Sequence, residues 1–212
     1  MDIILPQAQR YAEQFSSPAD ELLQEIALFT ETNHSEAQML SGHLQGKLLE
    51  MISRMIRPRR ILEIGTFTGY SALCLAKGLP DDGKLHTIEL RENDAATARQ
   101  YFDRSPFSNQ IILHTGQALS IVPEINETWD LVFIDADKVS YIDYFKLVLP
   151  KLSANGFILA DNIFFHGEVL TETPKGKSGK AMQAFNEFIQ ERNDIDKMII
   201  TLRDGLYLIR KL

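Results

Sequence analysis

Cysteine is nearly absent from the sequence, because Cys74 is the only one in 212 residues. One cysteine cannot form a disulfide within the chain, so a secreted domain built on disulfides is excluded. The first residues, MDIILPQAQRYAEQF, lack the basic start and the apolar stretch of a signal peptide. No run approaches the roughly 18 apolar residues of a membrane helix. We therefore expect a cytoplasmic protein that does not bind a membrane.

Positive charge is also in short supply. Lys and Arg total 22 against 29 Asp and Glu, which gives a formal charge of -7. Proteins that bind nucleic acid generally carry the opposite sign, so no nucleic-acid partner is expected. Hydrophobic residues make up 44% of the chain and charged residues 24%, an ordinary globular composition. We expect a single domain, 1–212, with a helical N-terminal region at 1–58 and a sheet-containing core at 59–212.

The core shows short apolar runs that alternate with amphipathic stretches. The runs lie at 61–65, 84–90, 110–116, 129–136, 156–162, 197–202 and 205–211, and helical patterns lie at 69–79, 92–104, 117–126, 138–151 and 179–192. Apolar strands separated by helices predict an α/β fold, with a mostly parallel sheet covered on both faces. Only Arg203 and Asp204 separate the last two runs, which predicts a hairpin and an antiparallel strand at one edge of the sheet.

A glycine-containing turn follows the first predicted strand. Gly65 and Gly69 are spaced G-x-x-x-G, and a helix begins at the second glycine, where backbone amides can face a ligand. Glu89 ends the next strand, where an acid can accept hydrogen bonds from a ribose. Each feature alone has an ordinary structural explanation. Together they favour a cofactor that contains adenosine.

Acidic side chains end two later strands. Asp135 follows WDLVFI, and Asp161 and Asn162 follow GFILA. Open α/β sheets bind ligands at the carboxyl ends of their strands. Three such oxygen ligands suit Mg²⁺, and Ca²⁺ or Mn²⁺ less specifically. The alternative is that both carboxylates only cap the segments that follow.

A long irregular stretch at 163–178 follows this second acidic pair. A stretch of that length in a compact domain is often a lid or a binding loop. Phe164 and Phe165 lie at its start, where they would either stack on a planar aromatic substrate or anchor the loop.

Taken together, the segments LEIGTFTGYSA, TIEL, HTGQAL, DLVFIDADKVSYIDYF and LADNIFFHG resemble the cation-dependent O-methyltransferases. This family includes catechol and caffeoyl-CoA O-methyltransferases. The resemblance runs from about Met39 to the C-terminus, with the motifs in the family's order. It implies a seven-stranded, Rossmann-like methyltransferase sheet with helices on both faces and an antiparallel C-terminal strand.

The resemblance also implies a set of residues that bind S-adenosylmethionine, which becomes S-adenosylhomocysteine. Those matching the methionine-binding motif are Glu63, Gly65, Thr66 and Ser71. The match for the ribose is Glu89, and the matches near the adenine are Gly116 and Ala118. The residues that match other positions around the cofactor are Met39, Ser41 and Asp135.

The resemblance places the chemistry next to this cofactor. The divalent cation, Mg²⁺ first, is held at positions matching Asp135, Asp161 and Asn162, and Lys138 matches the proposed general base. The implied reaction transfers a methyl group to a hydroxyl of a phenolic small molecule with two adjacent hydroxyls. Two neighbouring hydroxyls can bind one cation, which lowers their pKa. The resemblance further implies a homodimer.

The acceptor itself is left open by departures from the plant caffeoyl-CoA enzymes. The segment 41–47 differs from theirs, and His166 stands where they have a substrate-contacting Asn. Three other functions stay open. They are a metal-independent methyltransferase acting on another nucleophile, an NAD-type nucleotide-binding protein, and a binding module without catalysis.

Overall fold

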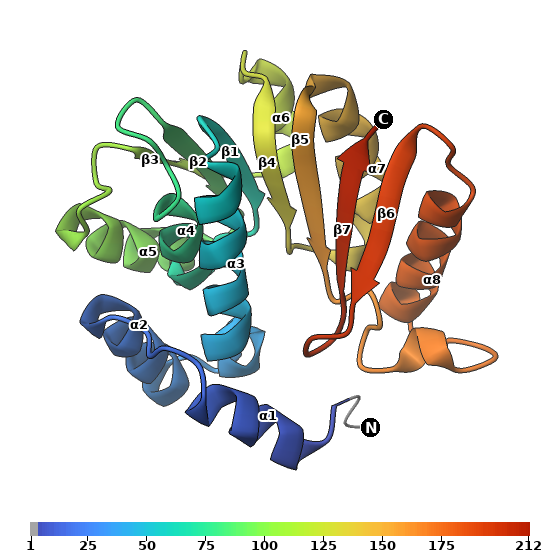
Figure 1. The fold of residues 1–212 in the computed structure, drawn as a ribbon, viewed down its shortest axis with the longest axis horizontal. Coiled ribbons are helices and arrows are strands. Elements are labelled where there is room, and N and C mark those ends of the chain that lie inside the picture. Colours follow the sequence, from blue (N-terminus) through green and yellow to red (C-terminus); the bar gives the residue numbers. More distant parts are fainter. Residues whose placement is uncertain (1–3) are drawn as a thin grey trace.

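A seven-stranded sheet forms the centre of the molecule, in the order β3-β2-β1-β4-β5-β7-β6 (Figure 1). The computed structural model describes residues 4–212, so the first three residues of the expected helical region lie outside the described part. The strands are β1 (Arg60–Ile64), β2 (Lys84–Glu89), β3 (Ile111–Thr115), β4 (Trp129–Ile134), β5 (Leu152–Asp161), β6 (Ile195–Ile200) and β7 (Leu206–Lys211). All seven expected apolar runs therefore form strands.

The C-terminal strand is not where the sequence suggested. β1 to β5 pair in parallel, and β7 runs antiparallel to both β5 and β6. The predicted antiparallel C-terminal strand is confirmed, but β7 lies between β5 and β6, so the strand at the edge is β6, which pairs antiparallel with β7 (Figure 1). The hairpin is real, but its short turn folds β7 inward. The pairs Asp161 with Leu206 and Ile200 with Leu206 show that one residue of β7 bridges both neighbours.

Helices cover both faces of the sheet, as expected. The longer helices are α1 (Pro6–Gln14), α2 (Glu21–Asn33), α3 (Gly42–Ile56), α4 (Tyr70–Ala76), α5 (Glu92–Arg104), α6 (Ala118–Glu124), α7 (Tyr141–Val148) and α8 (Lys177–Gln190). Buried side chains of α2 to α5 form one apolar core with the sheet. Side chains of α6, α7 and α8 form a second core on the opposite face.

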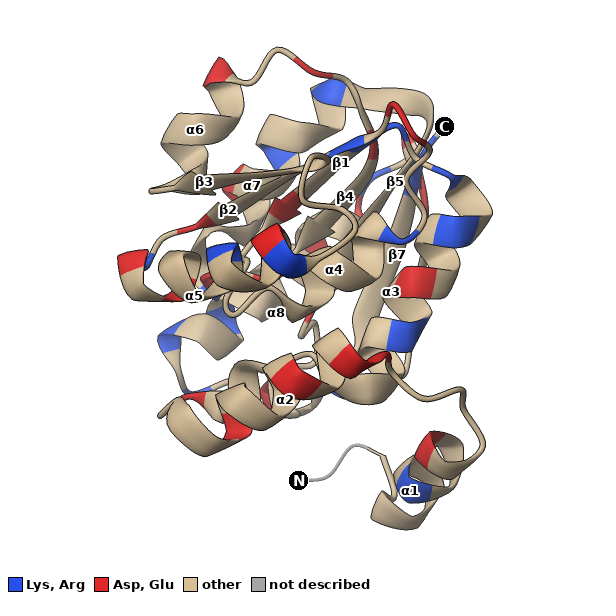
Figure 2. Ribbon diagram, turned by 90° about the vertical axis from the view of Figure 1, so that its left-hand side faces the viewer, with Lys and Arg blue, Asp and Glu red and all other residues tan. Residues whose placement is uncertain are grey.

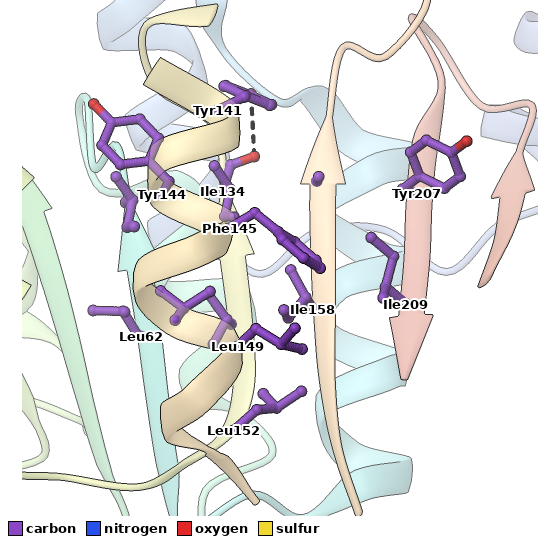
Figure 3. Close-up of a cluster of buried hydrophobic side chains, with 14 of the residues drawn as sticks. Leu62, Ile134, Tyr141, Tyr144, Phe145, Leu149, Leu152, Ile158, Tyr207 and Ile209 are labelled. Carbon is purple, nitrogen blue, oxygen red and sulfur yellow. Dashed lines mark hydrogen bonds between the residues drawn. The ribbon is translucent and has the colours of Figure 1, made fainter. Parts of the chain in front are cut away.

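The second core fixes the strand ends that carry the acidic residues. Phe145 of α7 is fully buried, and Figure 3 shows it directed from α7 towards β5 and β7. Burying an aromatic ring of this size contributes about 2–3 kcal/mol. The Tyr141 hydroxyl lies 3.2 Å from the carbonyl oxygen of Ile134, the last residue of β4 (Figure 3). Packing and this hydrogen bond hold the end of β4 in place.

A close contact between α3 and α4 brings α3 against the body of the protein. A Cβ on Gly46 would lie 2.6 Å from the Tyr70 ring and 2.9 Å from Cys74 Sγ, so only glycine allows this approach. The Cys74 side chain is buried there, and burial raises the pKa of its thiol. It is a packed, inert thiol. Because α3 packs this closely, Gln45, the residue before Gly46, lies at the end of β5.

α1 lies at the periphery of the molecule, beyond α2 (Figure 2). None of its residues is buried. The rings of Tyr11 and Phe15 stack on one another with centroids 4.4 Å apart, and both side chains are about two-thirds exposed. Within residues 4–212, no helix combines the length and apolar character needed to cross a bilayer.

Candidate functional site

A cavity of about 770 Å³ opens at the carboxyl ends of the parallel strands. The structure brings together at its wall nearly all the residues singled out from the sequence. Those lining it are Met39, Ser41, Gly65, Thr66, Ser71, Glu89, Gly116, Ala118, Asp135, Lys138, Asp161 and Asn162. These residues come from segments spread over more than 120 positions of the chain. Their convergence makes this cavity the candidate active site.

The glycine-containing turn forms the part of the wall between β1 and α4. Gly65 has φ +102°, and a Cβ at this position would lie 1.9 Å from the backbone oxygen of Asp135. Gly69 has φ +93°, with the Phe102 ring against the place a Cβ would take. Both glycines are therefore required by the backbone and by close packing. Their compactness leaves the space above the turn open for a ligand.

Glu89 organises the same turn from the end of β2. One carboxylate oxygen accepts hydrogen bonds from the backbone amides of Thr66, at 3.2 Å, and Phe67, at 2.7 Å. The other oxygen accepts from the amide of Arg91 at 2.9 Å. Both lone pairs of the first oxygen are thus engaged, whereas the second oxygen keeps one, so the carboxylate can shape the loop and still accept a hydroxyl from a ligand. Its structural role was not anticipated from the sequence.

Glu63 lies beneath the cavity wall rather than in it. Its side chain is fully buried and accepts a hydrogen bond from the Thr87 hydroxyl. Burial, together with the charges of Asp135 and Glu89, raises the pKa of Glu63 to about 8. The second oxygen, Oε1, is buried without a hydrogen-bond partner within the protein. The Ser71 side chain, which does line the cavity, lies beside this carboxyl group and acts to lower its pKa.

Asp135, Asp161 and Asn162 meet at the other end of the cavity, where β4 and β5 end side by side. Asp161 is 2% exposed. Burial and the nearby charge of Asp135 raise the pKa of Asp161 to about 7. Asn162 adopts a left-handed φ of +58°, and its backbone N–H donates to Asp161 Oδ1 at 2.7 Å. The negative charges of the two carboxylates repel one another, so both are candidate ligands for a cation.

Lys138 supplies the positive charge beside these acids. Its ammonium donates to Asp135 Oδ1 at 3.0 Å and to the Tyr141 hydroxyl at 2.8 Å. Burial alone would lower the pKa of Lys138, but Tyr141, Asp135 and Asp161 outweigh it and raise that pKa above the ordinary value. In this charge arrangement the Lys138 side chain is held as an ammonium.

Backbone strain is concentrated around the cavity. Among residues 4–212, left-handed φ values occur at six residues other than glycine, and five of these line the cavity. The five are Phe67, Asn162, Phe165, His166 and Arg203. Such conformations cost about 1–3 kcal/mol each and persist where the surrounding contacts hold them. Their clustering is typical of a functional site.

The start of the stretch 163–178 forms the outer wall. Phe165 lines the cavity, whereas the Phe164 ring lies over Gly205 in the turn between β6 and β7. The His166 side chain is 79% exposed, and its backbone N–H donates to Asp204 Oδ1 at 2.7 Å. One phenylalanine is thus an anchor and the other faces the ligand space. Further along, this stretch contains a short 3-10 helix and the start of α8.

Two polar residues of the site were missed from the sequence. Gln45 of α3 donates to Asp161 Oδ2 at 2.6 Å, and Arg203 lines the cavity from the turn between β6 and β7. A sequence signal existed for Gln45, because it shares a helix face with the apolar Leu49 and Ile52. A glutamine in an apolar stripe indicates a buried hydrogen bond. Arg203 gives no comparable signal.

The chain is similar in sequence and in structure to known O-methyltransferases. Residues 13–212 match the O-methyltransferase family. A catechol O-methyltransferase of Niastella koreensis is 33% identical over 162 residues, covering 74% of this chain and 73% of that protein. Caffeoyl-CoA O-methyltransferase 5 of Nicotiana tabacum is 28% identical over 181 residues, covering 79% and 75%. The SAH-bound structure of a Podospora anserina methyltransferase superposes with a TM-score of 0.90 at 30% identity, covering 99% and 98%.

Proposed function

The chain belongs to the O-methyltransferase family, and from that premise we propose that it transfers a methyl group from S-adenosylmethionine to one hydroxyl of a catechol-type small molecule, with a divalent cation bound at Asp135, Asp161 and Asn162. The single observation that supports this most strongly is the convergence of those three residues with the glycine-containing turn and Glu89 on one cavity. The cavity thus has one end suited to a nucleoside and another suited to a cation.

The cofactor end fits S-adenosylmethionine in its chemistry. Glu89 can accept from the ribose hydroxyls, Gly116 and Ala118 leave room for the adenine, and Met39, Ser41, Thr66 and Ser71 line the remainder. Glu63 lies fully buried beneath the turn and beside Ser71, so we propose that it supports the methionine part of the cofactor through Ser71. The SAH bound by the Podospora anserina protein supports the same assignment.

The opposite end fits a hard divalent cation. Among residues 4–212, no three His, Cys, Asp or Glu side chains cluster as a metal site, so the proposed set depends on the Asn162 amide as its third oxygen ligand. Two carboxylates and one amide oxygen suit Mg²⁺, with Ca²⁺ or Mn²⁺ as alternatives. When bound, such a cation lowers the pKa of a coordinated hydroxyl and fixes its position.

Lys138 is proposed to take the hydroxyl proton. Ligation would neutralise the Asp135 and Asp161 charges, which are among the causes that raise the pKa of Lys138. Burial would then act in the lowering direction and favour the neutral amine. The left-handed backbone at Phe165 places its ring at the cavity, where it can pack on a planar acceptor. Alignment of acceptor oxygen and methyl donor by these walls supplies much of the rate enhancement.

The test is transfer of labelled methyl from S-adenosylmethionine to a panel of catechols, with Mg²⁺ and with a chelator. Label in the catechol only when Mg²⁺ is present is the expected result. Label that persists after chelation would instead support a metal-independent methyltransferase. Label absent in both arms, with S-adenosylhomocysteine still bound, would contradict the catechol acceptor and revive a binding role. The family match replaces the NAD alternative.

The domain organisation, the location in the cell, the acceptor and the assembly are proposed as follows. We propose that one domain, 1–212, carries the activity in the cytoplasm and that the acceptor is phenolic, as for the catechol and caffeoyl-CoA relatives. We also propose a homodimer. The exposed aromatic pair Tyr11 and Phe15 on α1 supports it, since a nine-residue helix without buried residues gains stability from a partner surface.

A further inference from the structure

We propose that Gln45 and Arg203 are positioning residues for Asp161, holding its carboxylate in the orientation that receives the cation. This inference rests on the proposed function, because it gives Asp161 the role of a cation ligand. Neither residue belongs to the ligand set itself. Both act from a second layer, as the groups around a metal ligand commonly do.

The burial of Gln45 indicates that its amide has a purpose. The side chain is 1% exposed and lies on the face of α3 that Leu49 and Ile52 bury in the core. An amide left without partners in such a place costs about 1–3 kcal/mol, whereas an apolar residue of the same size would pack there at no such cost. A buried glutamine is therefore explained by its hydrogen bonds.

The bond from Gln45 fixes the Asp161 carboxylate. Gln45 Nε2 donates to Asp161 Oδ2 at 2.6 Å, while the backbone N–H of Asn162 donates to Oδ1 at 2.7 Å. Each carboxylate oxygen thus has one donor from the protein, and the two donors together prevent rotation of the group. Each oxygen keeps a further lone pair for a cation.

Arg203 supports the orientation of the Gln45 amide from its oxygen side. Arg203 Nη1 lies 3.4 Å from Gln45 Oε1 and also donates to the backbone oxygen of Ser41. A guanidinium can only donate, so the oxygen of the amide must face Arg203 and its NH₂ must face Asp161. Arg203 therefore supports the same amide orientation that the Asp161 carboxylate requires, although it stands in a turn 42 positions further along the chain.

The experiment measures Mn²⁺ affinity by electron paramagnetic resonance in the presence of S-adenosylhomocysteine, for the wild type and for Gln45→Met. Methionine has a similar volume and no donor, so we expect the Kd for Mn²⁺ to rise roughly 10- to 100-fold. Affinity for S-adenosylhomocysteine, measured by calorimetry, should stay within about twofold. Gln24→Met, the same change at an exposed position of α2, is the matched control and should leave both affinities unchanged.

A double-mutant cycle separates positioning from general damage. Arg203→Met should weaken Mn²⁺ binding less than Gln45→Met does, and adding it to Gln45→Met should cause no further loss, because Arg203 acts through Gln45. Additive losses in the double variant would contradict this link. If Gln45→Met does not fold, Arg203→Met decides alone, and an unchanged Mn²⁺ affinity there overturns the proposal.

Failure of this proposal can be told apart from failure of the proposed function. If Gln45→Met binds Mn²⁺ with the same affinity as the wild type, the positioning role is overturned and the proposed cation site stands. A wild type that binds S-adenosylhomocysteine but not Mn²⁺ overturns the cation site and the positioning role together.

Discussion

Gly65 and Asp135 are locked together through the backbone: a Cβ on Gly65 would lie 1.9 Å from the carbonyl oxygen of Asp135. In addition, the amide of Asp135 donates to the carbonyl of Ile64 at 2.9 Å. The glycine-containing turn and the first acidic residue of the proposed cation site therefore share one piece of rigid backbone.

Gly65→Ala is expected to lower the free energy of unfolding by on the order of 3 kcal/mol or more, because it adds both a clash and left-handed strain. Urea unfolding measures the loss. Gly167→Ala is the matched control, since Gly167 has φ +80° but open space around the position of a Cβ. It should lose only about 1 kcal/mol from the backbone conformation. Equal losses in the two variants would contradict the clash.

Asp161→Asn keeps the shape of the side chain and removes its charge. We expect loss of Mn²⁺ binding and of cation-stimulated methyl transfer, with affinity for S-adenosylhomocysteine within about threefold of wild type. Asp135→Ala should likewise abolish cation-stimulated turnover. Titration with Mn²⁺ followed by electron paramagnetic resonance measures cation binding, and calorimetry measures binding of S-adenosylhomocysteine. Asp103→Asn, on the exposed side of α5, is the control for charge removal. Unchanged turnover in the Asp161 variant would remove this residue from the site.

Glu89→Gln should weaken binding of S-adenosylhomocysteine by roughly 10- to 100-fold. The carboxylate accepts three backbone N–H groups, and hydrogen bonds to a charged acceptor contribute about 1.5–3 kcal/mol each. The new amide would turn a donor towards donors and loosen the turn beside the ribose. Calorimetry measures the Kd, with the exposed Glu92→Gln as control. A change of less than twofold in the Kd for S-adenosylhomocysteine would contradict the role of Glu89 in cofactor binding.

Glu50 gives a pH-dependent prediction outside the active site. Burial alone would raise its pKa, but the cations of Lys47, Lys77 and Arg54 lower it to about 2. A folded-state pKa below the ordinary 4.5 means that this stabilisation is present above pH about 4.5 and is lost as the pH falls towards 2. Glu50→Gln should therefore be less stable than wild type at pH 7, with the difference shrinking on acidification.

The measurement for Glu50 is urea unfolding of both proteins at a series of pH values. Glu31→Gln, an exposed position on α2, serves as the control for loss of one negative charge. A stability difference between Glu50→Gln and wild type that stays constant from pH 7 to pH 3 would show that the carboxylate charge is not its source.

The proposed homodimer is tested by the mass in solution. Light scattering should give twice the 24.1 kDa of the chain for the wild type. Replacing both Tyr11 and Phe15 by Glu should give the single-chain mass with unchanged methyl transfer. Leu170→Glu, at another exposed apolar position, should leave the dimer intact. A wild type of single-chain mass contradicts the assembly.

The fold was predictable because its signals are local. Apolar runs such as 129–136 gave their strands, and the family resemblance, the enzyme class and the mostly parallel sheet are confirmed. The start of β5 at Leu152 was missed, since the residues after it are polar and pair through an irregular register with β4. The position of β7 was also missed, because a hairpin determines which strands pair but not where the pair enters the sheet.

The site was predictable where residues follow strand ends, as Asp135 and Asp161 do. It was not predictable where a role depends on distant contacts. Gln45 meets Asp161 across 116 positions of sequence, and Arg203 meets Gln45 across 158. No local pattern encodes such a meeting, because it depends on how closely α3 packs on α4 and on how the last hairpin folds inward.

The inward position of β7 has a consequence for shortened chains. β7 pairs with β5 on one side and with β6 on the other, so a chain without residues 206–211 would leave the facing edges of both strands unpaired. Unpaired strand edges of this kind template pairing with other chains. A chain that ends before β7 is therefore expected to aggregate more readily than the whole chain, because β7 pairs both of these edges at once.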